Sequence, residues 1–280
     1  MKIPNFGYHF ARWEGELRRR RYRALLPTIV RRQVEPARTV PLDAFSYSGE
    51  AMLPEQVRSI RSFLRHVGRP KRFTVISDGT HSTQSIDLLR NIDPVVSVAS
   101  SGEHLPADLP DKFRHYVTTY PMGKQLGLIM SLPRNGPAFY VDSDVLFFRD
   151  AASLMPDIAS TAAPALYLPD CQDCSADSRV LRGPHEAGQP VNSGLLLLLR
   201  PLDWSLAIRR FLELEGEPNF FTNQTLVHLV MHANEARSLD PTRYVLQLDD
   251  QFIYPDRYAG PHLVLRHYVN PVRHKFWTVL

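Results

Sequence analysis

The chain has 280 residues, of which 44% are hydrophobic and 22% charged, and its formal net charge is +4 at pH 7. This is the composition of a globular protein with a sizeable core, which argues against disorder outside the N-terminal region. The charge is too small for this length to indicate nucleic-acid binding by itself. The longest apolar run, residues 195–199, is far too short for a transmembrane helix.

The N-terminal region, residues 1–40, is predicted to be a basic extension ahead of one domain that spans residues 41–280. A run of four arginines at 18–21 follows Trp13 and Leu17. The pattern allows two interpretations: a solvated helix packed on the domain, or a basic amphipathic helix in peripheral contact with an anionic membrane. The short apolar stripe favours the packed helix.

Strand and helix patterns alternate through the first half of the domain. We expect strands at 44–48, 72–77, 94–98 and 138–146, and helices at 53–66, 85–89 and 112–131, the last interrupted near 121–123. This alternation predicts an α/β fold with a mixed, mainly parallel central sheet flanked by helices.

The second half is less regular and contains a long polar loop. We expect strands at 165–168, 191–199, 244–248 and 262–267, helices at 202–213 and 223–233, and the loop at 170–190. Long loops in compact domains are often functional. This one carries Cys171 and Cys174, which we interpret as surface thiols because no second pair of soft ligands completes a zinc site. Reduced thiols and no recognisable secretory signal predict a cytoplasmic protein, peripheral at the inner membrane face if the extension contacts lipid.

Two carboxylates, Asp142 and Asp144, interrupt the strongly apolar segment 138–148. Aspartate is rarely buried unless it is paired or bound to a metal. In an extended segment both side chains project to one face, with Cα atoms about 6–7 Å apart, which a divalent cation can bridge. Such a cation would lie at the carboxyl end of a strand, where open α/β sheets bind ligands, and would offset the charge of a diphosphate leaving group. The alternative is a pair of aspartates that cap a turn.

Four segments resemble motifs of GT-A glycosyltransferases, in particular glycosyltransferase family 8. They are the Asp-Ser-Asp segment 139–147, the Asn-Ser-Gly segment 191–198, the Asn-Gln-Thr-Leu segment 223–226, and the segment 265–273 with the Phe-Trp pair that follows it. The resemblance spans residues 42–280. The chain departs from the family pattern at Asn270, where glycine is usual, at Arg273 and His274, where lysine is usual, and in Asn-Gln-Thr, where the family has Asp-Gln-Asp.

The resemblance implies a GT-A (Rossmann-like) fold and transfer of a sugar from a nucleotide-diphosphate donor, UDP-linked, with retention. The acceptor is a glycan, a lipid-linked molecule or a protein, and no nucleic acid is implied as a partner. The implied cofactor is Mn²⁺ or Mg²⁺, held by Asp142, Asp144 and His267. Imidazole among the ligands suits Mn²⁺ better than Mg²⁺.

The remaining site residues are predicted from the same resemblance. Asn192 and Gln224 would face the donor sugar, and Asp249 or Asp250 would act as a base if the reaction inverts. Predicted contacts to the nucleotide diphosphate are made by Ser46, Tyr47, Asp78, Lys124, Asp142, Ser143, Arg273 and His274. Arg273 can hold phosphate oxygens bidentately, which lysine cannot. Tyr47 could stack on the base.

Two other functions compete with this interpretation. A haloacid-dehalogenase-type phosphatase also uses an Asp-X-Asp motif after an apolar strand, with a distal aspartate pair that Asp249 and Asp250 could supply. Two observations count against it: at least two strands precede Asp142, and no lysine lies between Val145 and Asp250. The second alternative is a non-catalytic nucleotide-sugar-binding domain, which the intact set of metal ligands disfavours.

Overall fold

The computed structural model describes residues 6–101, 105–133, 135–171, 176–183, 186 and 188–279. A seven-stranded sheet in the order β3-β2-β1-β4-β7-β6-β8 forms its centre. The strands are β1 (Asp43–Ser48), β2 (Arg72–Ser77), β3 (Val96–Ser100), β4 (Ala138–Val141), β6 (Ala165–Pro169), β7 (Val191–Leu198) and β8 (Arg237–Ser238). Strands β1 to β4 pair in parallel, and β7 runs antiparallel to both β4 and β6. The predicted mixed, mainly parallel sheet is confirmed.

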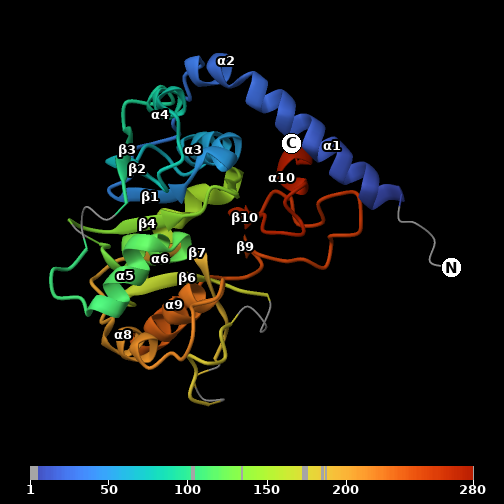
Figure 1. The fold of residues 1–280 in the computed structure, drawn as a ribbon. Coiled ribbons are helices and arrows are strands. Elements are labelled where there is room, and N and C mark those ends of the chain that lie inside the picture. The colour runs from blue at the N-terminus through green and yellow to red at the C-terminus, as the bar shows by residue number, and fades with distance from the viewer. Residues whose placement is uncertain are drawn as a thin grey trace.

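Helices cover both faces of this sheet (Figure 1). They are α3 (Leu53–His66), α4 (Thr83–Arg90), α5 (Asp111–Thr119), α6 (Pro121–Met130), α7 (Leu154–Ala159), α8 (Ser205–Leu212) and α9 (Thr222–Ala233), with short 3-10 turns at Glu50–Met52 and Arg149–Ser153. Successive residues of β4 point to opposite faces. Phe139 therefore packs with Phe63 of α3, whereas Tyr140 packs in the core formed with α6 and α9.

The prediction of one strand over residues 138–146 is wrong. β4 ends at Val141, and after a turn the chain enters β5 (Val145–Phe147), which belongs to a second sheet with β10 (Leu265–His267) and β9 (Tyr244–Val245). The antiparallel register of β5 and β10 pairs Val145 with His267. The backbone N–H of Tyr268 also donates to the carbonyl oxygen of Asp144, at 2.9 Å. The change of sheet thus delivers the C-terminal segment to the aspartate motif.

The N-terminal helices α1 (Phe6–Ala24) and α2 (Leu26–Arg31) lie along the domain, and α1 runs beside α10 (Lys275–Thr278) (Figure 1). Arg19 of α1 forms an ion pair with the buried Glu55 of α3 at 2.5 Å. These are the contacts of a packed helix, and they lend no support to the predicted membrane contact. No helix among the described residues combines the length and apolar character that crossing a bilayer requires. The division at residue 41 stays a prediction.

Candidate functional site

Three potential metal ligands meet at the turn between β4 and β5. Asp142 and Asp144 belong to this turn, and His267 is the last residue of β10. His267 Nε2 lies 3.0 Å from Asp144 Oδ1 and 3.8 Å from Asp142 Oδ2. One ligand atom from each of the three residues lies within 4.8 Å of the others. A cation bound at about 2.0–2.6 Å could contact all three at these separations. Asp144 and His267 are buried, whereas Asp142 is partly exposed toward a pocket.

The hydrogen bonds around His267 identify which ring nitrogen is available to bind a metal. The backbone N–H of Gly194 donates to Asn192 Oδ1 at 3.0 Å, so this oxygen is an acceptor. The same oxygen lies 3.0 Å from His267 Nδ1, which must therefore carry a proton. Nε2 then faces the Asp144 carboxylate, and a lone pair there would be repelled. Either a second proton or a cation must lie at Nε2, and the donor set fits a divalent cation held by one imidazole and two carboxylates.

The pKa shifts of the three ligands follow from their burial and mutual charges. Burial lowers the pKa of His267, but Asp144 and Asp142 outweigh it, so the net shift is upward. Burial raises the pKa of Asp144, but His267 and Arg273 outweigh it and lower the value to about 2. For Asp142 burial prevails and its pKa is raised. The site therefore concentrates negative charge in a poorly solvated space, which favours positive charge at its centre.

Two side chains that the sequence analysis missed orient Asp142. Tyr140 Oη donates to Asp142 Oδ1 at 2.7 Å, and Gln125 Nε2 donates to the same oxygen at 2.9 Å. Gln125 in turn accepts from Asn223 Nδ2 at 2.6 Å. These bonds leave Asp142 Oδ2 directed at His267. A signal was present for Tyr140, which shares a strand face with Asp142, whereas Gln125 follows Lys124 in its helix and does not stand out by polarity.

A pocket of about 340 Å³ opens beside the three ligands. On its wall Asp170 Oδ2 accepts from Asn192 Nδ2 and from Gln224 Nε2, each at 3.0 Å. Phe220 and Phe221 line the same pocket and are 68% and 37% exposed. Asp170 was not predicted, although it follows the buried strand β6 as Asp142 follows β4.

Arg273 belongs to this pocket, since its Nη2 donates to Asp144 Oδ2 at 2.7 Å. Ser143 is buried in the turn between the two aspartates. His274 does not line the pocket. Its Nδ1 faces the carbonyl oxygen of Pro271, and burial together with Lys275 lowers its pKa to about 4.

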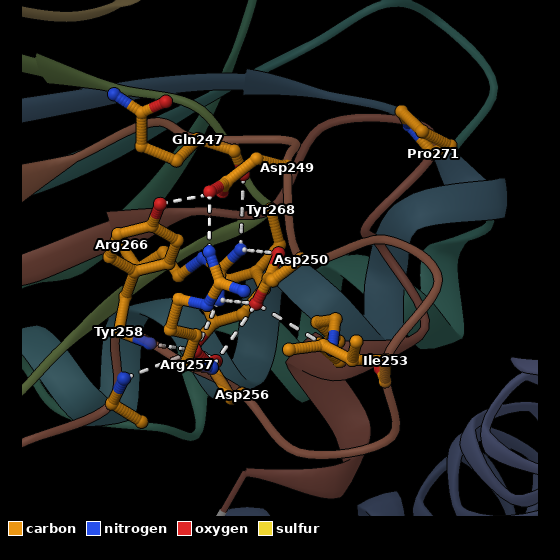
Figure 2. Close-up of polar contacts among 12 residues, drawn as sticks. Gln247, Asp249, Asp250, Ile253, Asp256, Arg257, Tyr258, Arg266, Tyr268 and Pro271 are labelled. Atoms are coloured by element: carbon orange, nitrogen blue, oxygen red, sulfur yellow. Dashed lines mark hydrogen bonds and ion pairs between the residues drawn. The ribbon is translucent and has the colours of Figure 1, made fainter. Parts of the chain in front are cut away.

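Asp250 is not brought to the site. It is fully buried and lies among the polar groups of Figure 2, paired with Arg266 Nη2 at 2.7 Å and with Lys275 Nζ at 3.6 Å. Arg266 also pairs with Asp256. A carboxylate held this way cannot reach a substrate in the pocket, so the structure offers no support for Asp250 as a base.

The residues predicted to contact the nucleoside lie at the carboxyl ends of β1 and β2. Asp78 and Lys124 line a separate cavity of about 590 Å³, and Lys124 Nζ is 3.5 Å from the Asp78 carbonyl oxygen. Tyr47 is half-buried, and burial raises its pKa to about 12. Ser46 instead points into the core, where its hydroxyl donates to Gln56 Oε1 at 2.7 Å. Cys171 is a free thiol, and Cys174 lies outside the described residues.

Comparison with solved structures identifies the fold. No protein-family model matches the sequence, and no curated protein matches it. The structure is similar to a galactosyltransferase, LgtC, in complex with donor and acceptor sugar analogues, with a TM-score of 0.53, 15% identity and coverage of 82% of this chain and 87% of that one.

Two further structures agree with this. Mouse xyloside xylosyltransferase 1 gives a TM-score of 0.52 at 14% identity over 84% of this chain and 99% of that one. The glycosyltransferase GlyE of Streptococcus pneumoniae gives 0.50 at 14% identity over 86% and 60%. The chain therefore has the predicted GT-A fold. Its assignment to family 8 stays a prediction.

Proposed function

We propose that the chain is a metal-dependent glycosyltransferase, which moves a sugar from a nucleotide-diphosphate donor, UDP-linked, to an acceptor with retention. The observation that carries the proposal is the meeting of Asp142, Asp144 and His267 at the carboxyl edge of the sheet, beside a pocket walled by side-chain amides. The GT-A fold supports it, because LgtC and the other similar structures with this fold are glycosyltransferases.

Mn²⁺ or Mg²⁺ would be held by the three ligands, and the imidazole favours Mn²⁺. The bound cation would supply Lewis-acid stabilisation to the departing diphosphate. Asp144 and His267 form the buried side of the site, and Tyr140 and Gln125 keep Asp142 aimed at it. These hydrogen bonds restrict the ligands to one geometry before any substrate binds.

Arg273 is the residue best placed to receive the diphosphate. Its guanidinium pairs with Asp144 and lines the pocket, where 37% of its side chain stays exposed. A planar guanidinium can hold two phosphate oxygens at once, and a diphosphate would compete with Asp144 for it. Tyr47 and Asp78, near the carboxyl ends of β1 and β2, and Lys124 of α6 would accommodate the rest of the nucleotide.

The donor sugar would lie against Asn192 and Gln224. Asp170 holds both amides through hydrogen bonds, so their positions are coupled. The assignment of Gln224 to the pocket is supported by LgtC, of which one structure is an active-site mutant with glutamate in place of glutamine. The acceptor would enter past Phe220 and Phe221, whose rings stand exposed at the pocket.

Donor turnover with and without metal tests the proposal. The full chain is incubated with a panel of UDP-sugars in MnCl₂ or in EDTA, and UDP release is measured. We expect release only with metal, and its loss in Asp144→Asn, whose thermal unfolding should stay cooperative. Asp87→Asn is the matched control, because Asp87 is exposed on α4 and does not line the pocket. Full activity of Asp144→Asn would contradict the proposal.

The same assay separates the alternatives. The phosphatase would use the distal pair Asp249 and Asp250 together with the Asp-Ser-Asp motif, and the pairing of Asp250 with buried Arg266 counts against it. Hydrolysis of p-nitrophenyl phosphate without UDP release would favour it nevertheless. Metal-dependent UDP binding with no turnover of any donor would favour the non-catalytic binding domain.

A further inference from the structure

A second cleft, of about 780 Å³, lies between α1 and the C-terminal segment. Its wall includes Arg12 and Trp13 of α1 and His274 and Trp277 of the C-terminal segment. Asn270 and Arg273 line both this cleft and the candidate metal pocket. The two spaces are therefore neighbours that share one wall. Residues of α1 line this second cleft but not the metal pocket.

Close contacts fix α1 in this place. A Cβ atom added to Gly15 would lie 2.7 Å from the backbone oxygen of His274, so only glycine allows the helix to approach this closely. The Tyr8 ring meets the His274 ring edge-on, with centroids 5.8 Å apart. Arg19 is anchored to Glu55 on the opposite side of the cleft. The cleft is thus a built feature of the fold, with side chains held from both sides.

Arg12 differs from most arginines of its helix. Four of them have carboxylate partners, in the pairs Arg18–Glu14, Arg19–Glu55, Arg20–Glu16 and Arg23–Glu50. Arg12 is exposed in the cleft, and among the residues that the structure describes no carboxylate pairs with it. Its guanidinium lies 5.5 Å from the centroid of the Tyr8 ring. Its charge also contributes to the lowered pKa of His274, after burial and Lys275.

We propose that this cleft binds a phosphate-bearing group, with Arg12 as a phosphate ligand contributed by the N-terminal helix. The unpaired guanidinium offers two parallel donors to phosphate oxygens. Tyr8, Trp13 and Trp277 would pack on a ring attached to the phosphate. The inference deepens the proposed function, because the phosphate belongs either to the donor diphosphate or to a phosphorylated acceptor.

Binding of inorganic pyrophosphate to the full chain, in EDTA at low salt, tests the site by calorimetry. Arg12→Gln should weaken this binding about tenfold, as expected for the loss of a charge-assisted contact. Arg21→Gln is the matched control: Arg21 lies on the same helix, is exposed, and does not line the cleft. Gly15→Ala should weaken binding as well, because it pushes α1 away from His274.

Two further ligands distinguish the sources of the phosphate. Weaker binding of UDP with Mn²⁺ to Arg12→Gln identifies the donor diphosphate, whereas weaker binding of hexose 1-phosphate with unchanged UDP binding identifies a phosphorylated acceptor. Equal pyrophosphate affinity of Arg12→Gln and the unaltered chain overturns the proposal. Metal-free pyrophosphate binding needs no sugar transfer, so its failure is separable from a failure of donor turnover.

Discussion

At the residue scale, Asn192 connects the metal ligands to the pocket wall. Its Oδ1 accepts from the Gly194 backbone and from His267 Nδ1, and its Nδ2 donates to Asp170 and faces Gln224 Oε1. One amide thus determines which nitrogen of His267 would face a metal, and it also positions the side chains of Asp170 and Gln224. Residues that hold a metal-bound histidine in this way affect metal affinity without touching the metal.

Replacement of Asn192 by alanine should therefore weaken metal activation. Loss of the acceptor for His267 Nδ1 lets the imidazole rotate or change tautomer, and we expect an apparent Mn²⁺ affinity about 10–100-fold lower. The measurement is donor turnover as a function of MnCl₂ concentration, with the thermal midpoint followed in parallel. Asn91→Ala is the matched control, because Asn91 is exposed at the C-terminal end of α4 and does not line the pocket. An unaltered metal-activation curve for Asn192→Ala would refute this role.

At the element scale, the site depends on the close approach of β7 to β10. A Cβ atom added to Gly194 of β7 would lie 2.2 Å from His267 Cε1 and 2.7 Å from Asp142 Oδ2. We expect Gly194→Ala to displace a metal ligand and to abolish Mn²⁺-dependent turnover. Gly260→Ala is the comparison, because there the nearest atom would be 3.8 Å away. Retention of Mn²⁺-dependent turnover by Gly194→Ala would show that β7 does not limit the space for His267.

Strong periodic patterns made some elements predictable and concealed others. The helix at 53–66 and the strand at 72–77 were predicted with the bounds that the structure has. The turn at 142–144 was considered only as the alternative to an extended segment, because apolar residues flank it on both sides and the passage between two sheets leaves no break in the pattern. The third ligand, His267, is 123 residues from Asp144, and only the resemblance to a known family connected them.

The direction of a side chain at a strand end was harder to predict. Ser46 was expected in the nucleotide site, but it lies in the core with Gln56. A short polar side chain there suits either environment, because one buried hydrogen bond satisfies it. Asp170 was missed for the opposite reason: the polar loop that follows it obscured its position at the end of an apolar strand. Carboxylates after buried strands are thus informative even without a second aspartate.

The buried pair of Arg266 and Asp250 stabilises the segment that carries β10. Arg266 is fully buried, donates twice to Asp250, and lies 5.0 Å from the ring centroids of Tyr258 and Tyr268 (Figure 2). Arg266→Met removes the guanidinium that pairs with the buried Asp250 and Asp256, and leaves Asp250 with Lys275 as its remaining cation. We therefore expect a loss of about 3–5 kcal/mol in the free energy of unfolding in urea. Arg257→Met removes a half-exposed pair with Asp249 and should cost less than about 1 kcal/mol.

The effect of Arg266→Met should also depend on pH. Burial raises the pKa of Asp250, but Arg266 and Lys275 outweigh it and the net shift is downward. A carboxylate whose folded pKa lies below its unfolded value stabilises the protein above the unfolded pKa, about 4, and loses that contribution as the pH falls through the folded pKa. The difference between the two proteins should thus be larger at pH 7 than at pH 3. A constant difference would mean that packing, and not charge, accounts for the loss.

At the scale of the whole molecule, the candidate site lies where the central sheet changes direction. Strands β1 to β4 are parallel, β7 runs against β4, and the second sheet joins at the turn after β4. The proposed metal ligands come from that turn and from β10, and the pocket wall comes from α6, β7, α9 and the residue that follows β6. One bound cation would therefore tie together segments that are far apart in the chain.

Metal binding should consequently raise the stability of the entire fold. A cation that binds only the folded state stabilises it by about 2.7 kcal/mol at 100 times its Kd. With an unfolding entropy of about 2.1 cal/mol/K per residue, this corresponds to a rise in Tm of about 5 °C for a chain of this size, measured by calorimetry in MnCl₂ and reversed by EDTA. Asp144→Asn should show no such rise, since it removes a charged buried ligand at nearly constant side-chain size, although its amide can accept from only one of His267 and Arg273. An equal rise in Tm in that variant would mean that Mn²⁺ binds elsewhere. The stabilisation would then not come from the site formed by Asp142, Asp144 and His267.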